Sequence, residues 1–482
     1  MSSRSRLQLV ALMGVFLVMA AACGQKPGVA DSAPGGLSAG TELNLPEGTE
    51  LDAEGNLVDS ETGEIIATAE ELAENNPGLA SGTDDTGDTG TTGGTDTGED
   101  GTGDAPPTEG GARTGDATGV TAETIKIGIH APITGAAPVP SQSFQKGKDL
   151  YWEWLRSQKQ TINGRDVEVV FRNDNYNPSQ AVQACREMVE QEEVFLLMGV
   201  AGTDQIQACA RYAASAGVPY VSAGVTEIGL TGLRNYFAIW RSYKQQGPLL
   251  ADLLVSRLGA RDEKNGMVRF NTPTFQDGHD GFVEAMESSG ADVEYDRAVS
   301  KTSGASEAQT IATELNQQGI ENVHVLVSPT FFIQLAQAAA NQQYRPQWVG
   351  YGITMGIDTV ASVACRNSQS IQNGRFFSPF PAYVDSNKFD PNFRKAGGTD
   401  DIMFGLWGSS KVIGEMLKNG GQALTRESFI LANEQAPTIK TGVNPDVSFS
   451  ESDHFGGTSM HLLRADCPNN RYVTEKAFAT GF

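Results

Sequence analysis

The apolar positions from residue 125 onward follow two alternating patterns. Short continuous apolar runs are typical of buried strands, and segments whose apolar residues recur every three or four positions are typical of helices. The runs at 125–131, 167–171, 194–200 and 218–222 predict strands, and the segments at 144–157, from Pro178 onward and at 205–216 predict helices between them. Strand and helix alternate throughout, which predicts a doubly wound lobe built on a parallel sheet.

The same plan begins again after residue 236. Strands are predicted at 265–270, 292–295, 322–327 and 346–352, and helices at 246–258, 279–289, 306–318 and 331–342. A further helix at 404–418 and a strand at 459–464 must complete the two lobes. Two consecutive segments of one architecture, each the size of a single domain, predict an α/β body with two lobes.

Small residues follow two strands of the first lobe. The run at 194–200 leads into Ala201-Gly202-Thr203, and the run at 218–222 leads into Ala223-Gly224-Val225-Thr226. In open parallel sheets, ligands bind beyond the carboxyl ends of the strands. Small residues leave space there, and hydroxyls with free backbone amides offer hydrogen bonds. These strand ends therefore predict a ligand site.

The first 23 residues have the features of an export signal. Arg4 and Arg6 precede a short apolar run, which leads through Ala20-Ala21-Ala22 to Cys23. This arrangement is typical of a secretory signal. A cysteine after small residues resembles the bacterial lipoprotein signal, and an ordinary signal with a chance cysteine is the alternative. We expect residues 1–23 to be a lipoprotein signal peptide, with a lipidated Cys23 anchoring the exported chain to the outer face of the bacterial cell membrane.

Residues 24–120 are rich in Gly, Thr, Asp and Pro and are strongly acidic. They hold 21 acidic and 2 basic residues, which accounts for −19 of the formal net charge of −24. The segment has too few apolar residues to offset the entropy lost on folding, so we predict a disordered linker, with a small hairpin or helix at 43–72 as the alternative there. The rest of the chain shows no basic stripe, which disfavours nucleic acid as a partner.

The remaining cysteines, Cys185, Cys209, Cys365 and Cys467, form an even set in an exported chain, which favours disulfides. Sequence alone permits three pairings. The predicted helices carrying Cys185 and Cys209 flank one strand, so neighbouring positions on one sheet face favour this pair, with Cys365–Cys467 as the second. The spacing is not that of zinc ligands, and we expect no metal site.

The sequence carries no enzyme signature. The histidines are scattered, and none lies beside a serine or cysteine in a nucleophile-elbow pattern. There is no glycine-rich phosphate loop of the GxxxxGKS or GxGxxG type. We therefore expect a binding protein without catalytic activity or cofactor.

Short motifs occur in a fixed order between Ile125 and Asp466. They are Ile127-Gly128, Thr134-Gly135, Phe144 with Gly147, Asn173-Asp174, the segment 177–182, Met198-Gly199 with Thr203, the segment 217–222 with Thr226, Gln246-Gly247-Pro248, and Gly405 with Gly408. Together they resemble the type I periplasmic solute-binding proteins of ABC importers, in particular the leucine/isoleucine/valine-binding branch.

This resemblance implies a fold and a function. It implies two Rossmann-like lobes joined by three hinge crossings, near 241–243, 375–377 and 449–451. Lobe 1 would hold residues 121–241 plus 377–449, and lobe 2 residues 242–376 plus 450–482. A small polar solute, an amino acid or a related amide or carboxylate, would bind in the cleft of a monomer and pass to an ABC permease in the membrane. The alternative is a ligand-sensing surface lipoprotein that signals to a membrane partner.

The resemblance also implies ligand contacts. Thr203 matches the hydroxyl that holds a carboxylate at a helix start, where free N–H groups favour anions, although it also suits a plain helix cap. Gly224 and Thr226 match a carbonyl and a hydroxyl at the second strand end. Phe275 matches an aromatic ring that covers the ligand, with core packing as the alternative, and Ser328 lies near a further contact.

One position departs from the family pattern. The glutamate that partners an α-amino group in the family falls on Gly352 or its neighbour Tyr351, and neither carries a carboxylate. Asp277 or Asp358 would have to take its place. Otherwise the ligand lacks an α-amino group, because a buried ammonium without an anionic partner is costly.

Overall fold

The computed structural model describes residues 49–51, 57–59, 65–67, 115–223, 226–350 and 357–482. The chain divides into two units, residues 1–105 and 106–482. The predicted signal peptide, Cys23, Gly224 and Gly352 lie outside the described residues. Among the helices that are described, none has the length and apolar character needed to cross a membrane.

The first unit contains a small antiparallel sheet, of strands β1 (Thr49–Leu51), β2 (Leu57–Asp59) and β3 (Ile65–Ala67). These strands fall in the segment where a hairpin was the alternative to disorder, so the prediction of a structureless linker is wrong for them. The linker prediction is also too long at its other end. Asp116 accepts a 2.8 Å hydrogen bond from the Arg426 amide, and Val120 bridges to Ile125.

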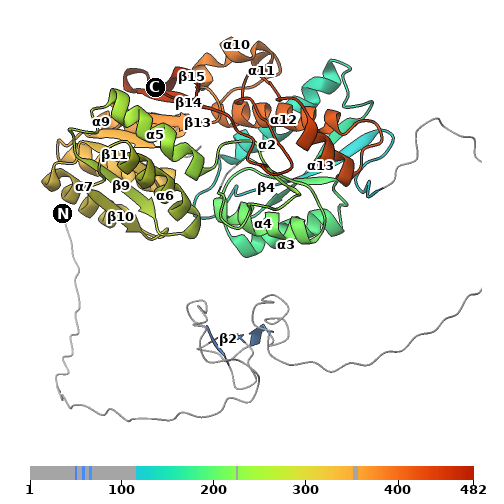
Figure 1. Cartoon of the computed structure of the whole chain (residues 1–482), viewed down its shortest axis with the longest axis horizontal. Helices are drawn as coiled ribbons and strands as arrows, with labels where there is room; N and C mark the ends of the chain where they lie inside the picture. Colours follow the sequence, from blue (N-terminus) through green and yellow to red (C-terminus); the bar gives the residue numbers. More distant parts are fainter. Residues whose placement is uncertain (1–48, 52–56, 60–64, 68–114, 224–225, 351–356) are drawn as a thin grey trace, which may run out of the picture. The chain divides into compact units, whose positions relative to one another are not determined.

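The second unit begins with a lobe built on a five-stranded parallel sheet (Figure 1). Its order is β5-β4-β6-β7-β8, with β4 (Thr124–Ala131), β5 (Asp166–Asn173), β6 (Leu196–Gly199), β7 (Tyr220–Ser222) and β8 (Tyr236–Ala238). Its helices are α2 (Ser141–Ser157), α3 (Pro178–Glu190), α4 (Thr203–Ser215), α12 (Asp401–Asn419) and α13 (Arg426–Gln435). We call this the first lobe.

The second lobe is built on a seven-stranded sheet of order β10-β9-β11-β12-β13-β14-β15. Its strands are β9 (Asn265–Phe270), β10 (Tyr295–Val299), β11 (Asn322–Leu326), β12 (Gln347–Gly350), β13 (Arg375–Ser378), β14 (Met460–Asp466) and β15 (Arg471–Ala479). Strand β14 runs antiparallel to both of its neighbours, β13 and β15, and all other neighbouring strands are parallel. Its helices are α5 (Tyr243–Arg257), α6 (Pro273–Ser288), α7 (Ala305–Gln318), α8 (Pro329–Asn341) and α9 (Asp358–Ser368).

Short helical turns complete the second unit. They are η2 (Tyr383–Asp385), α10 (Ser386–Phe389) and α11 (Pro391–Lys395) between β13 and α12, and η3 (Cys467–Asn469) between β14 and β15. The fold is therefore the predicted pair of α/β lobes.

Local sequence signals explain where the main helices begin. Asn177, Ser242, Thr272 and Ser328 cap α3, α5, α6 and α8 with side-chain oxygens that accept backbone N–H groups. Close packing of α5 on α6 depends on small residues, because a Cβ added at Gly247 would lie 2.4 Å from the Gly281 carbonyl carbon.

Of the three crossings between the lobes, one lies where the resemblance predicts it, and two lie elsewhere. The first follows β8 and ends before α5, as expected near 241–243. Strand β13 belongs to the seven-stranded sheet, so the second crossing comes after Ser378 and not at 375–377. Phe455 still bridges to Ala238 in the first lobe, so the third crossing lies between Phe455 and Met460 and not at 449–451. The second crossing shifts because β13 pairs with β12 and β14, and the third shifts because the bridge from Phe455 to Ala238 keeps the chain on the first sheet.

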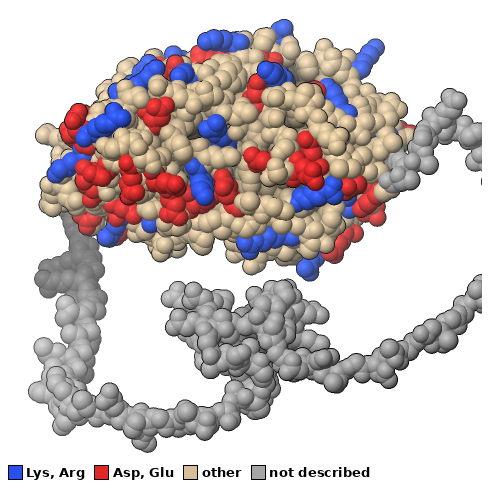
Figure 2. Space-filling model, in the orientation of Figure 1, with Lys and Arg blue, Asp and Glu red and all other residues tan. Residues whose placement is uncertain are grey.

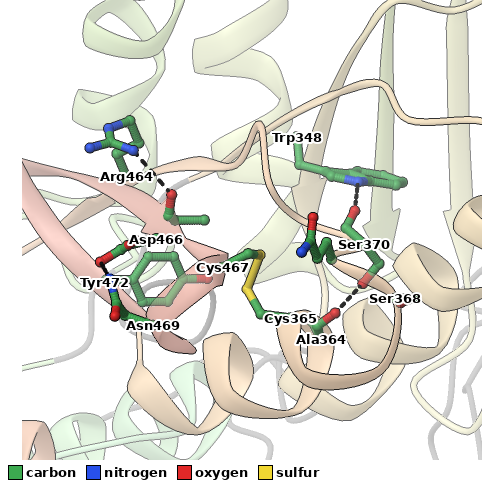
Figure 3. The surroundings of a disulfide bond; sticks show 12 residues. Trp348, Ala364, Cys365, Ser368, Ser370, Arg464, Asp466, Cys467, Asn469 and Tyr472 are labelled. Atoms are coloured by element: carbon green, nitrogen blue, oxygen red, sulfur yellow. Dashed lines mark hydrogen bonds between the residues drawn. A yellow bond between two sulfur atoms is a disulfide. The ribbon is translucent and has the colours of Figure 1, made fainter.

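Two disulfides hold the body together. Cys185 pairs with Cys209 between α3 and α4, and Cys365 pairs with Cys467 between α9 and η3. This is the pairing that the predicted helix positions favour. Figure 3 shows the second disulfide beneath Trp348, whose indole N–H donates to the Ser370 carbonyl at 2.9 Å. It links the parallel part of the second sheet to its antiparallel C-terminal strands.

Charged side chains of both signs are interspersed over the face of the body in Figure 2. Charge on this face is therefore mixed, unlike the one-sided acidity of residues 24–120.

Candidate functional site

The two sheets share a strand order that creates matching crevices. In each lobe the first strand lies between the second and the third, giving β5-β4-β6 in one and β10-β9-β11 in the other. The connections from these central strands leave in opposite directions, and ligands bind at such switch points beyond the carboxyl ends of the strands. The two crevices face one cavity between the lobes.

The cavity has a volume of about 100 Å³. Its lining comes from both lobes and is predominantly apolar. The described residues that line it are Ala137, Pro138, Val139, Pro140, Tyr176, Val200, Ala201, Gly202, Thr203, Ala223, Trp240, Tyr243, Phe275, Val327, Ser328, Pro329, Ile357, Ile402, Gly405, Leu406 and Ser409.

Helix starts position the polar residues of this cavity. Thr203 is the first residue of α4, after Gly202, whose φ of 82° lies in the left-handed region that favours glycine. Ser328 caps α8 by accepting the Phe331 N–H at 3.3 Å. Phe275 lies in the first turn of α6. The cavity thus brings together three of the residues singled out from the sequence, Thr203, Phe275 and Ser328.

The other predicted contacts differ in their surroundings. Thr226 does not line this cavity, and its hydroxyl donates to Oδ2 of Asp277 at 3.3 Å. Gly224 and Gly352 are outside the described residues, so their roles stay predictions. Sequence reasoning missed Trp240, which follows β8, and Leu406, which lies within α12. Both belong to apolar runs that resemble ordinary core, and only the position of the partner lobe distinguishes them.

The two acids considered as partners for a ligand amino group are occupied elsewhere. Oδ2 of Asp277 accepts the Glu227 N–H at 2.8 Å, and Oδ1 of Asp358 accepts the Tyr472 N–H at 3.0 Å. Neither residue lines the cavity. Asp277 and Asp358 therefore hold the protein together and are not available as ligand partners in this arrangement.

A chain of hydrogen bonds, which we call the interlobe clasp, joins α4 of the first lobe to the second lobe. It consists of Thr203, Asp204, Thr274 and Lys301. The Thr274 hydroxyl donates to Oδ1 of Asp204 at 2.8 Å and lies 3.0 Å from the Thr203 hydroxyl, which must therefore donate to it. Lys301 pairs with Oδ2 of Asp204, and its ammonium lies 5.4 Å from the ring centre of Tyr176. The clasp adjoins the cavity through Thr203, which lines it, and holds the lobes in contact.

A second contact between the lobes is buried. The Asp358 N–H at the start of α9 donates to Oδ2 of Asp401 at the start of α12, at 2.6 Å. Burial is the main reason that the pKa of Asp401 rises from 3.8 to about 7, and the nearby Asp358 carboxylate adds to the rise. Burial likewise raises the pKa of Asp358. These acids make the contact between α9 and α12 sensitive to pH.

Weakening the clasp should open the cleft. In the double variant T274V/K301M, which loses both donors to Asp204, we expect faster hydrogen exchange at the amides of Glu227 and Asp358, because both donate across the interface. The loss of two partly exposed hydrogen bonds should speed this exchange roughly tenfold. Exchange measured by mass spectrometry checks it.

Thr310→Val is the matched control, because the Thr310 hydroxyl donates only within α7, to the Ser306 carbonyl. Unchanged exchange at both amides in T274V/K301M would show that the clasp does not hold the lobes together.

Stability should depend on pH through Asp401. An acid with a raised pKa in the folded state binds its proton more tightly there than in the unfolded chain, so stability falls as pH rises from about 4 to about 7. Asp401→Asn keeps an acceptor for the Asp358 N–H and removes the charge. We expect D401N to gain stability over the wild type across this window, by up to about 1.4 kcal/mol per pH unit.

Urea unfolding at pH 4.5 to 8.5 measures the difference between D401N and the wild type. The exposed Asp262 supplies the control D262N, for which we expect a flat difference. A pH-independent difference for D401N would contradict the buried, protonated Asp401.

Comparison with known proteins places this geometry in a family. The sequence profile described as periplasmic binding protein matches residues 124–471. An amino acid binding protein of Pseudomonas aeruginosa is 26% identical over 142 residues, which cover 28% of this chain and 37% of that protein. The chain thus matches little more than a third of the length of this relative.

Solved structures share the fold at low identity. A fatty acid ABC transporter substrate-binding protein from Thermomonospora curvata has a TM-score of 0.63 at 17% identity, covering 76% of this chain and 94% of its own. A branched chain amino acid ABC transporter from Thermus thermophilus with bound valine has a TM-score of 0.62 at 16% identity, and the match covers 74% of this chain and 96% of that chain. An ABC transporter solute binding protein from R. palustris in complex with benzoate has a TM-score of 0.63 at 16% identity, and the match covers 74% of this chain and 97% of that chain.

The family profile covers both lobes, all three crossings and the described residues that line the cavity. Because it matches well over half of the sequence, the chain belongs to the periplasmic binding protein family.

Proposed function

We propose that the chain is the exported solute-binding component of an ABC importer. It binds a small solute, an amino acid or a related amide or carboxylate, in the cavity between the lobes and delivers it as a monomer to a membrane permease. The observation that carries this proposal is the cavity at the switch points of both sheets, next to the interlobe clasp.

The mechanism is closure of the two lobes on the ligand. A ligand that touches both lobes binds the closed arrangement better than the open one and shifts the equilibrium toward it. Hinge closure of this kind is established for periplasmic binding proteins in general. Thr203 belongs both to the ligand site and to the contact between the lobes, because it lines the cavity and donates to Thr274 of the second lobe.

The named solutes of the similar structures have a carboxylate in common. Fatty acids, valine and benzoate all carry one. The first turn of α4 begins at Thr203 in the cavity wall, and a helix start favours an anion through its free N–H groups and the helix dipole. These facts support a carboxylate held by the N–H groups at the start of α4.

A thermal unfolding screen with amino acids, amides and small carboxylates tests the proposal. A ligand at a hundredfold excess over its dissociation constant should add ~2.7 kcal/mol of stability. Thr203→Ala should lose part of this gain, because it removes the hydrogen bond from Thr203 to Thr274 that holds the closed form, and Thr203→Ser should keep it because the hydroxyl remains. A screen in which no member of these classes stabilises the protein would reject the proposal.

The membrane anchor is proposed from the sequence alone. If Cys23 is lipidated, the full chain should fractionate with membranes, and Cys23→Ser should release it into the soluble exported fraction. Immunoblots of the two fractions measure the distribution. Membrane association that persists in C23S would contradict anchoring through this residue.

A further inference from the structure

The cavity offers no charged partner for a ligand. Its described lining contains no Asp, Glu, Lys, Arg or His, and residues 224–225 and 351–356, which lie outside the described part, include none of these types in the sequence. Asp204 and Asp277, the acids of the clasp and of α6, are already bonded to Lys301 and to the Glu227 amide. A ligand ammonium therefore finds no carboxylate to pair with, which makes its burial costly.

The unused hydrogen-bonding capacity of the lining is rich in donors. The buried indole N–H of Trp240 has no partner in the described part of the chain. Ser328 accepts from the Phe331 amide at 3.3 Å, and Ser409 accepts from Asn444 at 3.5 Å, so each hydroxyl keeps its proton for a ligand. Donors of this kind complement an oxygen acceptor, above all a carboxylate, which forms the stronger hydrogen bonds.

Helix starts add to this preference. Helices α4, α5, α6 and α8 each contribute residues of their first turn or cap to the cavity wall: Thr203, Tyr243, Phe275 and Ser328. Each start carries a positive partial charge, which favours anions and disfavours cations. The positive electrostatic potential of the helix starts and the hydrogen-bond donors of the side chains thus favour the same kind of ligand, an anion.

The size and the apolar surface of the cavity determine which hydrocarbon body the ligand can carry. Val139, Trp240, Phe275, Ile402 and Leu406 give it apolar walls. Its volume is about 100 Å³, and an apolar cavity of ~150 Å³ accommodates benzene. A short branched or unbranched hydrocarbon body of roughly four to five heavy atoms, smaller than benzene, fits this space.

We infer that the cleft selects short apolar monocarboxylates that lack an α-amino group, and discriminates against the corresponding amino acids. This inference rests on the proposed function and narrows its ligand class. The carboxylate accepts from the donors that line the cavity, which are the N–H groups at the start of α4 and the side chains of Trp240, Ser328 and Ser409, and the hydrocarbon body packs on the apolar walls. An amino acid of the same shape adds an ammonium that the cavity leaves unpaired.

Matched pairs that differ only in the amino group provide the test. Isothermal titration compares 3-methylbutanoate with valine and 4-methylpentanoate with leucine, and 3-methylbutanamide tests the need for charge. We expect each carboxylate to bind at least a hundredfold more tightly than its amino acid, and at least tenfold more tightly than the amide.

Two conservative variants test the donors. Trp240→Phe removes the N–H and keeps an aromatic wall, and Ser328→Ala removes one hydroxyl. Each should weaken 3-methylbutanoate binding roughly tenfold. Ser362→Ala is the control, because that hydroxyl donates to the Thr359 carbonyl in α9 outside the cavity, and its affinity should be unchanged.

The outcomes separate the inference from the proposed function. If valine or leucine binds as tightly as its deaminated counterpart, the inference is overturned and the solute-binding function stands. Equal affinity for the amide, or unchanged affinity in both W240F and S328A, overturns the carboxylate assignment. If no member of the panel binds, the inference is overturned, and the thermal unfolding screen decides the proposed function separately.

Discussion

The parallel direction of the central strands constrains the whole body. When neighbouring strands run the same way, their carboxyl ends meet at one edge and the following helices begin there. Both sheets obey this rule with the same inner order, β5-β4-β6 and β10-β9-β11. The cleft therefore collects strand ends and helix starts from both lobes. The antiparallel strands β14 and β15 extend the second sheet at its far edge and leave this arrangement intact.

The acids near the cleft illustrate how this architecture separates binding from closure. Asp204, Asp277 and Asp401 all accept hydrogen bonds that join the lobes, from Thr274, from the Glu227 amide and from the Asp358 amide. These acids thus serve the interface, and none of them lines the cavity. Because these carboxylates face the partner lobe and not the cavity, the same contacts that join the lobes also shape the preference for ligands.

Much of the fold follows from sequence because its signals are local. Apolar runs, caps such as Ser328 and helix starts such as Pro178 depend on neighbouring residues, and the order of motifs identifies the two lobes. The residues of the site could be predicted from the sequence only in part. Thr203, Phe275 and Ser328 stand at strand or helix ends, which a sequence pattern marks, whereas Trp240 and Leu406 sit in apolar segments with no such mark. The crossings after Ser378 and Phe455 were missed because strand pairing is a long-range property.

The ligand contributes more free energy to closure than the contacts between the lobes do. The Asp204–Lys301 pair is partly exposed, with side-chain exposures of 21% and 28%, so solvent limits its contribution to roughly 1 kcal/mol or less. The buried Asp401 disfavours the folded state above its raised pKa, because its charged form is poorly solvated there. Burial of 100 Å² of apolar ligand surface contributes ~2.5 kcal/mol, more than this ion pair. Closure thus depends mainly on how well the ligand fills the apolar wall, and a weak clasp lets the cleft reopen when the ligand leaves.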